Sequence, residues 1–289
     1  MLYACGSNGN GQLGIRHNED VSEWTPVPLD LEGPIDLAGG GNHTIIVEHS
    51  TGSAYTTENN VFRIIPHPAG IQWLFCSAGW DFTFLVDADN RLWQVTFPFR
   101  LDLMPWVLPS AVESIESGMR HTVVRLVNGQ VFAWGASRKA QCGIVASEVT
   151  EPNEIEVQFN KPVAVACGRD YTVVLQNEMS AVTVWGPENK FPDLKQGPQP
   201  DKIDLLLSGW SHIMLGKKMY GTNFHNQLEL PVTDFETAAL GSEHGLCVQG
   251  TTVYTWGWGE HGNCPAPKRF ESPGNVRVFG GCATSFVYV

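Results

Sequence analysis

Four histidines share one short sequence context and are the first candidates for chemistry. His43, His121, His212 and His244 each stand three residues after a glycine. Imidazole nitrogens are common metal ligands and general bases, but both uses need the side chains to converge. Long and similar intervals separate these four residues, which indicates one histidine in each unit of a repeat. We therefore expect each imidazole to form a local hydrogen bond to a backbone group and not to bind a metal.

Other segments resemble catalytic motifs only in part. The Gly-Lys-Lys at 216–218 lacks the preceding glycine and the Ser or Thr of a phosphate-binding loop. The glycine-rich segment 6–11 recurs as a loop of the repeat, and no βαβ unit follows it. Asp87 and Asp89 alternate like calcium ligands, but no glycine or glutamate completes such a loop. The sequence thus predicts no catalytic residue, no metal, no cofactor and no enzymatic activity.

The composition bounds the class of protein and its partners. The 289 residues are 43% apolar and 17% charged, which is too apolar for a disordered chain. The net charge of −12 argues against direct binding to DNA and to an anionic membrane surface. The N-terminal segment has neither the basic nor the apolar part of a signal peptide. Seven scattered cysteines without a C-x-x-C pair fit reduced thiols, so we expect an intracellular protein.

An internal repeat positions the histidines. Its first phrase is a glycine, two variable residues, His or an aromatic residue, then Thr or a small residue before an apolar run. The seven copies are residues 40–44, 79–83, 118–122, 168–172, 209–213, 241–245 and 281–285. The intervals between their histidine-equivalent positions are 39, 39, 50, 41, 32 and 40 residues. A period near 40–45 residues with short apolar strands is typical of a β-propeller with four strands in each blade.

A second phrase, a β-like run that ends in aromatic-Gly, completes the repeat. It occurs at residues 3–6, 132–135, 184–186, 219–221 and 254–257, and some copies continue into a loop such as Gly-Gln-Leu-Gly. The second and third units keep the strand but lose the Trp-Gly. The chain begins with the second phrase and finishes with the first. The sequence therefore predicts one all-β domain over 1–289, a closed seven-bladed β-propeller of four-stranded antiparallel blades, with the N- and C-terminal strands completing one blade.

The alternation of antiparallel strands within each blade predicts one face for partner binding. Two strands separate the Gly-x-x-His turn from the Trp-Gly loop, so both should emerge on the same face of the disc. Eight residues of these turns and of the loop after residue 257 are candidate partner-binding residues: Trp80, Met119, Arg120, Arg169, Trp210, Trp258, Glu260 and His261. Trp80 and Trp210 would act as interface anchors; the alternative is that they pack sideways on neighbouring loops. We expect Trp134, Trp185 and Trp256 to fill spaces between blades.

Taken together, Gly-x-x-His-Thr, aromatic-Trp-Gly and Gly-Gln-Leu-Gly resemble the repeat of the regulator of chromosome condensation superfamily. The resemblance covers the whole chain. Within it, segments 6–14 and 256–264 are similar to the fungal alpha-tubulin suppressor family, which is also associated with killer-toxin insensitivity. That narrower resemblance implies a non-enzymatic heterodimer with a small zinc- or iron-binding protein of diphthamide synthesis. It further implies support of diphthamide formation on elongation factor 2 and, indirectly through Elongator, of tRNA wobble-uridine modification, in the cytoplasm and nucleus.

Two other functions stay open. The founding superfamily member suggests a guanine-nucleotide exchange factor for a small Ran-type GTPase. That founding member inserts a protruding hairpin and carries a basic tail. This chain shows neither pattern, although the 50-residue interval leaves room for a short extra hairpin at 138–161. A propeller that binds some other protein is the third reading. We favour the scaffold that docks a small metal protein.

Overall fold

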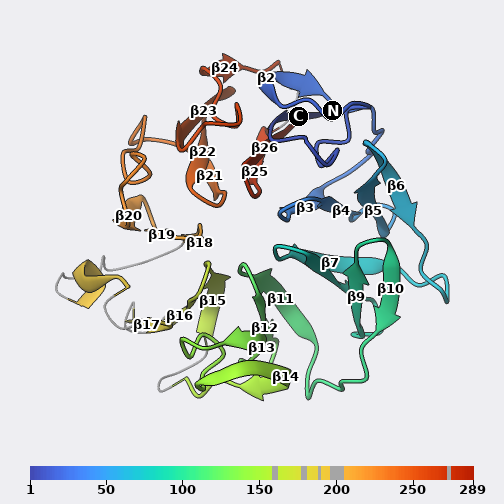
Figure 1. The fold of residues 1–289 in the computed structure, drawn as a ribbon, viewed down its shortest axis with the longest axis vertical. Helices are drawn as coiled ribbons and strands as arrows, with labels where there is room; N and C mark the ends of the chain where they lie inside the picture. The colour runs from blue at the N-terminus through green and yellow to red at the C-terminus, as the bar shows by residue number, and fades with distance from the viewer. Residues whose placement is uncertain (158–161, 177–180, 188–189, 196–204, 272–274) are drawn as a thin grey trace.

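A computed structural model describes residues 1–289 except 158–161, 177–180, 188–189, 196–204 and 272–274. The chain forms seven antiparallel sheets, and Figure 1 shows them arranged as a ring, each with one edge strand near the middle and the opposite edge strand toward the rim. The first three blades are β3 (Ile35–Gly39), β4 (Thr44–Glu48), β5 (Ser53–Glu58) and β6 (Val61–Ile65); β7 (Trp73–Ala78), β8 (Phe82–Asp87), β9 (Leu92–Thr96) and β10 (Arg100–Leu103); and β11 (Val112–Ser117), β12 (His121–Leu126), β13 (Val131–Ser137) and β14 (Ala146–Glu154). We number them blades 1 to 3.

Blades 4 to 6 complete the arc. They are β15 (Pro162–Cys167), β16 (Thr172–Gln176) and β17 (Ala181–Trp185); β18 (Leu206–Ser208), β19 (His212–Leu215) and β20 (Lys218–Gly221); and β21 (Thr237–Leu240), β22 (His244–Gln249), β23 (Thr252–Gly257) and β24 (Lys268–Arg269). Blades 4 and 5 have three strands in the described part of the chain, and a short 3-10 helix, η2 (Pro192–Lys195), follows blade 4. The prediction of an all-β, seven-bladed propeller is confirmed.

Blade 7 joins the two ends of the chain. Its strands run in the order β2 (Val21–Pro26), β1 (Leu2–Gly6), β26 (Thr284–Tyr288) and β25 (Arg277–Gly280). β1 pairs with β26 from Leu2↔Tyr288 to Gly6↔Thr284, and the two termini lie side by side in Figure 1. The predicted completion of one blade by both ends is therefore confirmed. Pairing each end in this way removes two open strand edges from the ring.

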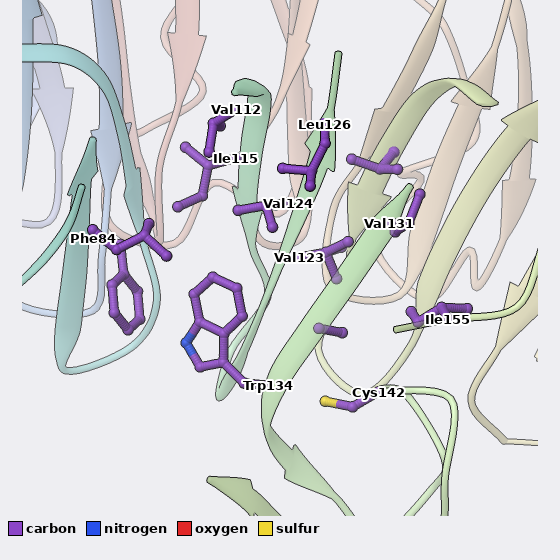
Figure 2. Packing of buried hydrophobic residues seen from close by; sticks show 14 of the residues in the cluster. Phe84, Val112, Ile115, Val123, Val124, Leu126, Val131, Trp134, Cys142 and Ile155 are labelled. Carbon is purple, nitrogen blue, oxygen red and sulfur yellow. The ribbon is translucent and has the colours of Figure 1, made fainter. Parts of the chain in front are cut away.

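The hydrophobic core lies between the blades. The second strand of each blade is flanked by sheets on both faces, and this explains its almost continuous run of Val, Ile and Leu; every residue of β4 and of β16 is buried. One cluster joins blades 2, 3 and 4 through Phe84, Val124 and Val174. Figure 2 shows its Val and Ile side chains stacked beside Trp134. The outermost strands β2 and β10 are mostly exposed or half-buried.

The extra residues of the 50-residue interval build an outer strand. β14 spans nine residues and pairs with β13 from Phe132↔Glu154 to Ser137↔Ala146, with two register shifts. Residues 138–145 form the loop that leads into it, so an added hairpin is not formed within 138–157, and residues 158–161 lie outside the described part. In the described part of the chain, no helix has the length and hydropathy needed to cross a membrane.

Candidate interaction face

The two repeated phrases emerge on the same face, as parity predicts. In four blades the residue after aromatic-Gly donates its backbone N–H to the carbonyl of the residue before the histidine position. These bonds are Ser7→Ala283 at 2.9 Å, Ala136→Arg120 at 2.8 Å, Thr222→Ser211 at 3.1 Å and Trp258→Glu243 at 2.9 Å. The Gly-x-x-His turn and the Trp-Gly loop of each of these blades are thereby bound into one surface, which we call the turn face.

The glycine of aromatic-Gly is required by this close approach. Gly6, Gly135 and Gly257 have φ values of 112°, 101° and 93°, in the left-handed region that other residues rarely adopt. A Cβ atom on Gly135 would stand 2.5 Å from the carbonyl oxygen of Arg120. The phrase is therefore a backbone junction and not a binding motif.

Three of the histidines link neighbouring blades through hydroxyl groups, which are partners that the sequence did not predict. His43 Nε2 lies 2.7 Å from Thr83 Oγ1 in the next blade, and His121 Nε2 lies 3.0 Å from Thr172 Oγ1. His244 makes the same contact with Ser285 at 3.0 Å. We call the boundary between two adjacent blades a seam. At each of these three seams, the hydroxyl that follows the histidine position of one blade faces the imidazole of the preceding blade. The spacing of the sequence does not reveal this contact.

The protonation of these histidines follows from their partners. Thr172 Oγ1 donates its single proton to the carbonyl of Gln141 at 2.8 Å, so it must accept from Nε2–H of His121. The Nδ1 atom of His121 is buried without a partner. Burial of the ring lowers the pKa of His43, His121 and His212 to about 4 and that of His244 to about 3. These four imidazoles are neutral at pH 7, and those of His43, His121 and His244 hydrogen-bond across the seams.

Backbone hydrogen bonds also connect the turns around the centre of the ring. Each bond runs from an N–H in one turn to a carbonyl in the turn of the next blade. The six are Gly41→Trp80 at 2.8 Å, Trp80→Met119 at 2.9 Å, Met119→Gly168 at 3.3 Å, Arg169→Trp210 at 3.2 Å, Trp210→Ser242 at 2.6 Å and Ser242→Gly281 at 3.1 Å. They fix the main chain beneath the predicted site residues without using the side chains of these turns.

The turns surround the mouth of a central channel. This cavity has a volume of about 470 Å³ and is lined by the innermost strand of every blade. Trp80 of blade 2 and Trp210 of blade 5 line it from distant points of the ring, and their indole rings meet with centroids 5.6 Å apart at an angle of 47°. Both rings are half-buried. Trp80 also lies over Gly41, where a Cβ atom would approach its ring to 2.8 Å.

Two predicted arginines and a methionine flank the tryptophans. Met119 is half-buried at the channel mouth, whereas Arg120 and Arg169 are exposed. Neither guanidinium forms an ion pair with any described residue. The turn face therefore presents two indoles at the channel mouth and two uncommitted cations on turns that adjoin it.

The remaining three predicted residues form a separate group on the loop after β23. Trp258 and His261 pack edge to face with ring centroids 5.3 Å apart, and Glu260 is exposed. His261 Nδ1 lies 2.8 Å from Asp20 Oδ2, so this loop contacts the β1–β2 loop of blade 7. The structure thus brings Trp80, Met119 and Trp210 together at the channel, whereas this loop group does not line the channel.

The tryptophans expected in the core are there. Trp134 and Trp256 are 4% and 6% exposed and pack between blades. Trp185 is half-buried against the cluster that joins blades 2, 3 and 4. Among the described residues, no three His, Cys, Asp or Glu side chains gather in a group that could hold a metal ion.

Sequence reasoning missed one cavity at the seam between blades 2 and 3. It has a volume of about 650 Å³, and Trp106, Trp134 and Arg138 contribute to its walls. The signal for it was present, because the third unit lacks the Trp-Gly and the Gly-rich loop that follows in other units. Arg120 lies on its edge, so the cavity opens beside the predicted site.

Comparisons with known proteins identify the repeat. Residues 1–47 and 128–175 match the family model for the regulator of chromosome condensation (RCC1) repeat. An RCC1 repeat-containing protein of Schizosaccharomyces pombe is 23% identical, over 100% of this chain and 99% of the relative. A secretion-regulating guanine nucleotide exchange factor of Bos taurus is 25% identical, over 91% of this chain and 75% of the relative.

Solved structures agree on the fold. Human WBSCR16 superposes with a TM-score of 0.77 at 14% identity, over 99% of this chain and 98% of the other. Yeast RCC1 (Prp20), solved bound to Kap60, superposes with a TM-score of 0.79 at 17% identity, over 99% and 88%. Two segments of this chain thus resemble the RCC1 repeat, and the solved structures share its propeller fold.

Proposed function

We propose that this RCC1-repeat propeller is a non-enzymatic regulatory subunit that binds a protein partner on its turn face. The observation that carries the proposal is the meeting of Trp80 and Trp210 over the channel mouth, beside the unpaired Arg120 and Arg169. Tryptophan and arginine are the residues that most often anchor protein interfaces. The inter-blade backbone bonds hold these anchors in place before a partner arrives, which lowers the entropic cost of association.

The partner we propose is the small zinc- or iron-binding protein of diphthamide synthesis, in a heterodimer. Support comes from the resemblance of segments 6–14 and 256–264 to the alpha-tubulin suppressor family. These two segments adjoin in space, because a Cβ atom on Gly6 would lie 2.9 Å from Cβ of Asn263. Through this partner the protein would assist diphthamide formation on elongation factor 2 and Elongator-dependent wobble-uridine modification, in the cytoplasm and nucleus.

The charge of the chain suggests the electrostatic character of the partner. With a net charge of −12, the propeller as a whole attracts a protein that carries a basic region, and this region should dock away from Arg120 and Arg169. The association rate should then fall as salt concentration rises, while the dissociation rate changes little.

Isothermal titration calorimetry of the full chain against that zinc protein from the same organism tests the proposal. A one-to-one complex with submicromolar affinity supports it. The absence of both heat and co-elution on a sizing column contradicts the choice of partner. Fluorescent tagging of the chain in the native organism tests the proposed location.

Guanine-nucleotide exchange is the second candidate. It is favoured by the secretion-regulating guanine nucleotide exchange factor of Bos taurus, whose 25% identity extends over 91% of this chain. Release of a fluorescent guanine nucleotide from a Ran-type GTPase measures this activity directly. Acceleration of release by catalytic amounts of the propeller would favour exchange over the scaffold reading.

A further inference from the structure

The seam between blades 2 and 3 lacks a part that other seams possess. In blade 7 the loop after β1 packs against blade 1. Its Leu13 is fully buried against Ile46, and the carbonyl of Gln12 accepts a hydrogen bond from Thr44 Oγ1 at 2.7 Å. The loop after β13 does the same for blade 4, through Cys142 and the carbonyl of Gln141. Each of these loops closes the seam on the turn face.

Blade 2 has no such loop, because β9 and β10 are joined by the short turn of residues 97–99. The cavity of about 650 Å³ lies at this seam. Phe82, Phe84, Trp106 and Trp134 provide aromatic walls, and Arg120 and Arg138 stand at the exposed edge. The cavity therefore occupies the position that the chain's own loop fills elsewhere.

A hydrogen-bond donor without an acceptor marks the same place. In blade 6 the indole N–H of Trp256 donates to the carbonyl of Gln227, which belongs to the loop of blade 5, at 2.8 Å. Trp134 has the corresponding register, since it pairs with Thr122 as Trp256 pairs with Gly245. Trp134 is 4% exposed, yet its Nε1 has no hydrogen-bond partner. Figure 2 shows this nitrogen on the side of Trp134 that faces Phe84, another cavity residue.

We propose that this seam receives a loop of a partner protein, which replaces the missing blade-2 loop. The loop would place a backbone carbonyl as acceptor for Trp134 Nε1–H or Thr122 Oγ1–H and an apolar side chain among the aromatic walls. The chain's own loops supply the model for this occupant, because they present a Gln carbonyl next to a buried Leu or Cys. The proposal rests on the proposed function for its biological use, since both require a protein partner.

A peptide titration observed at the tryptophan indoles tests it. The probe is the acetylated and amidated peptide of residues 8–15, Asn-Gly-Asn-Gly-Gln-Leu-Gly-Ile, and the control is the same peptide with Leu13→Asp. Nuclear magnetic resonance of the full chain labelled with ¹⁵N tryptophan resolves its 10 indole groups. We expect saturable shifts at Trp134 and Trp106 with a dissociation constant of about 1 mM, and binding of the control at least about tenfold weaker.

A substitution that fills the cavity provides the matched test on the protein. Ala136 lines the cavity, and Trp258 occupies the equivalent position in blade 6, so Ala136→Trp introduces a residue that the fold already accepts there. Ala136→Trp should abolish the peptide response, whereas Thr222→Trp, the same change in blade 5, should preserve it.

Three results would overturn the proposal: no shift at Trp134 or Trp106, equal responses to both peptides, or a response that survives Ala136→Trp. Shifts produced by guanosine monophosphate but by neither peptide would identify a small-ligand pocket and would also reject it. The zinc protein is absent from this experiment, so failure here leaves the calorimetric result on the turn face intact, and the reverse also holds.

Discussion

The indole rings of Trp80 and Trp210 are in contact across the mouth of the central channel, although 130 residues separate them in sequence. They belong to blades 2 and 5, which no strand pairing connects. Ring contact between such distant turns means that a partner seated over the channel meets the two indoles as one aromatic surface. Aromatic pairs in this tilted arrangement also stabilise each other.

Removal of either indole should weaken partner binding. Trp80→Ala or Trp210→Ala is expected to cost about 2 kcal/mol or more of binding free energy, because centrally placed tryptophans are typical hot spots. The losses should be non-additive in the double variant, because the rings touch. Calorimetry with the zinc protein measures both. Val127→Ala, at an exposed turn at the other end of the strands, is the control; a large drop in melting temperature with unchanged affinity would instead assign the indoles to stability.

The glycine of Gly-x-x-His should be intolerant of a side chain. A Cβ atom on Gly118 would stand 2.1 Å from the carbonyl oxygen of Gly168 and 2.5 Å from the ring of His121. Gly118→Ala is therefore expected to lower the free energy of unfolding by about 1–3 kcal/mol or more. Urea denaturation measures this loss. Gly9→Ala, where no atom lies within 4 Å, should change stability by much less, and equal effects of the two would refute the steric explanation.

The buried histidines should make stability depend on pH. The pKa of His121 is about 4 in the folded protein and near 6.5 when unfolded, so the unfolded chain takes up the proton first as pH falls. The free energy of unfolding is thus highest above about pH 6.5. It declines toward about pH 4 by about 1.4 kcal/mol per pH unit for each such histidine. His121→Phe should be less stable at pH 7 by about 1 kcal/mol, since one hydrogen bond is lost, and should show a shallower decline.

Urea midpoints measured at several values between pH 4 and pH 7.5 test that expectation. Phe82 occupies the histidine position of blade 2, so the fold already accommodates the replacement ring. Identical slopes for the parent and for His121→Phe would show that the imidazole titrates normally in the folded state.

Closure of the ring should depend on the buried side chains of β1. Leu2 is fully buried against Ile35 and Phe286, so Leu2→Ala removes contacts to blade 1 and to the C-terminal strand. We expect a loss of about 2–5 kcal/mol, as for other buried leucines. Met1→Ala is the control, because Met1 is 63% exposed. Calorimetric melting distinguishes the two, and a wild-type melting temperature for Leu2→Ala would contradict the role of β1 in closure.

The blade number, the closure and the shared face were predictable because the glycines that encode them serve local geometry. Gly135 is required by a contact with Arg120 in the paired strand, and Gly118 by the ring of His121 three residues later as well as by Gly168 of the next blade. Their positions in the repeat therefore indicate where the turns form. The His121–Thr172 bond was not predictable, since it crosses a seam whose width the spacing does not contain. The same holds for the Trp80–Trp210 contact. The cavity beside Trp134 was foreshadowed by the lost Trp-Gly of the third unit, but an absence in sequence does not say whether neighbouring side chains fill the gap.

The six backbone hydrogen bonds around the channel allow the binding surface to evolve independently of the fold. Since main-chain hydrogen bonds join these turns, the exposed side chains beside them can be exchanged while those bonds between the blades remain. Such a surface can acquire a new partner through a few substitutions while the scaffold stays constant. A library that randomises the exposed turn residues Asn42, Asp81, Arg120 and Arg169 should therefore yield folded propellers with different binding preferences.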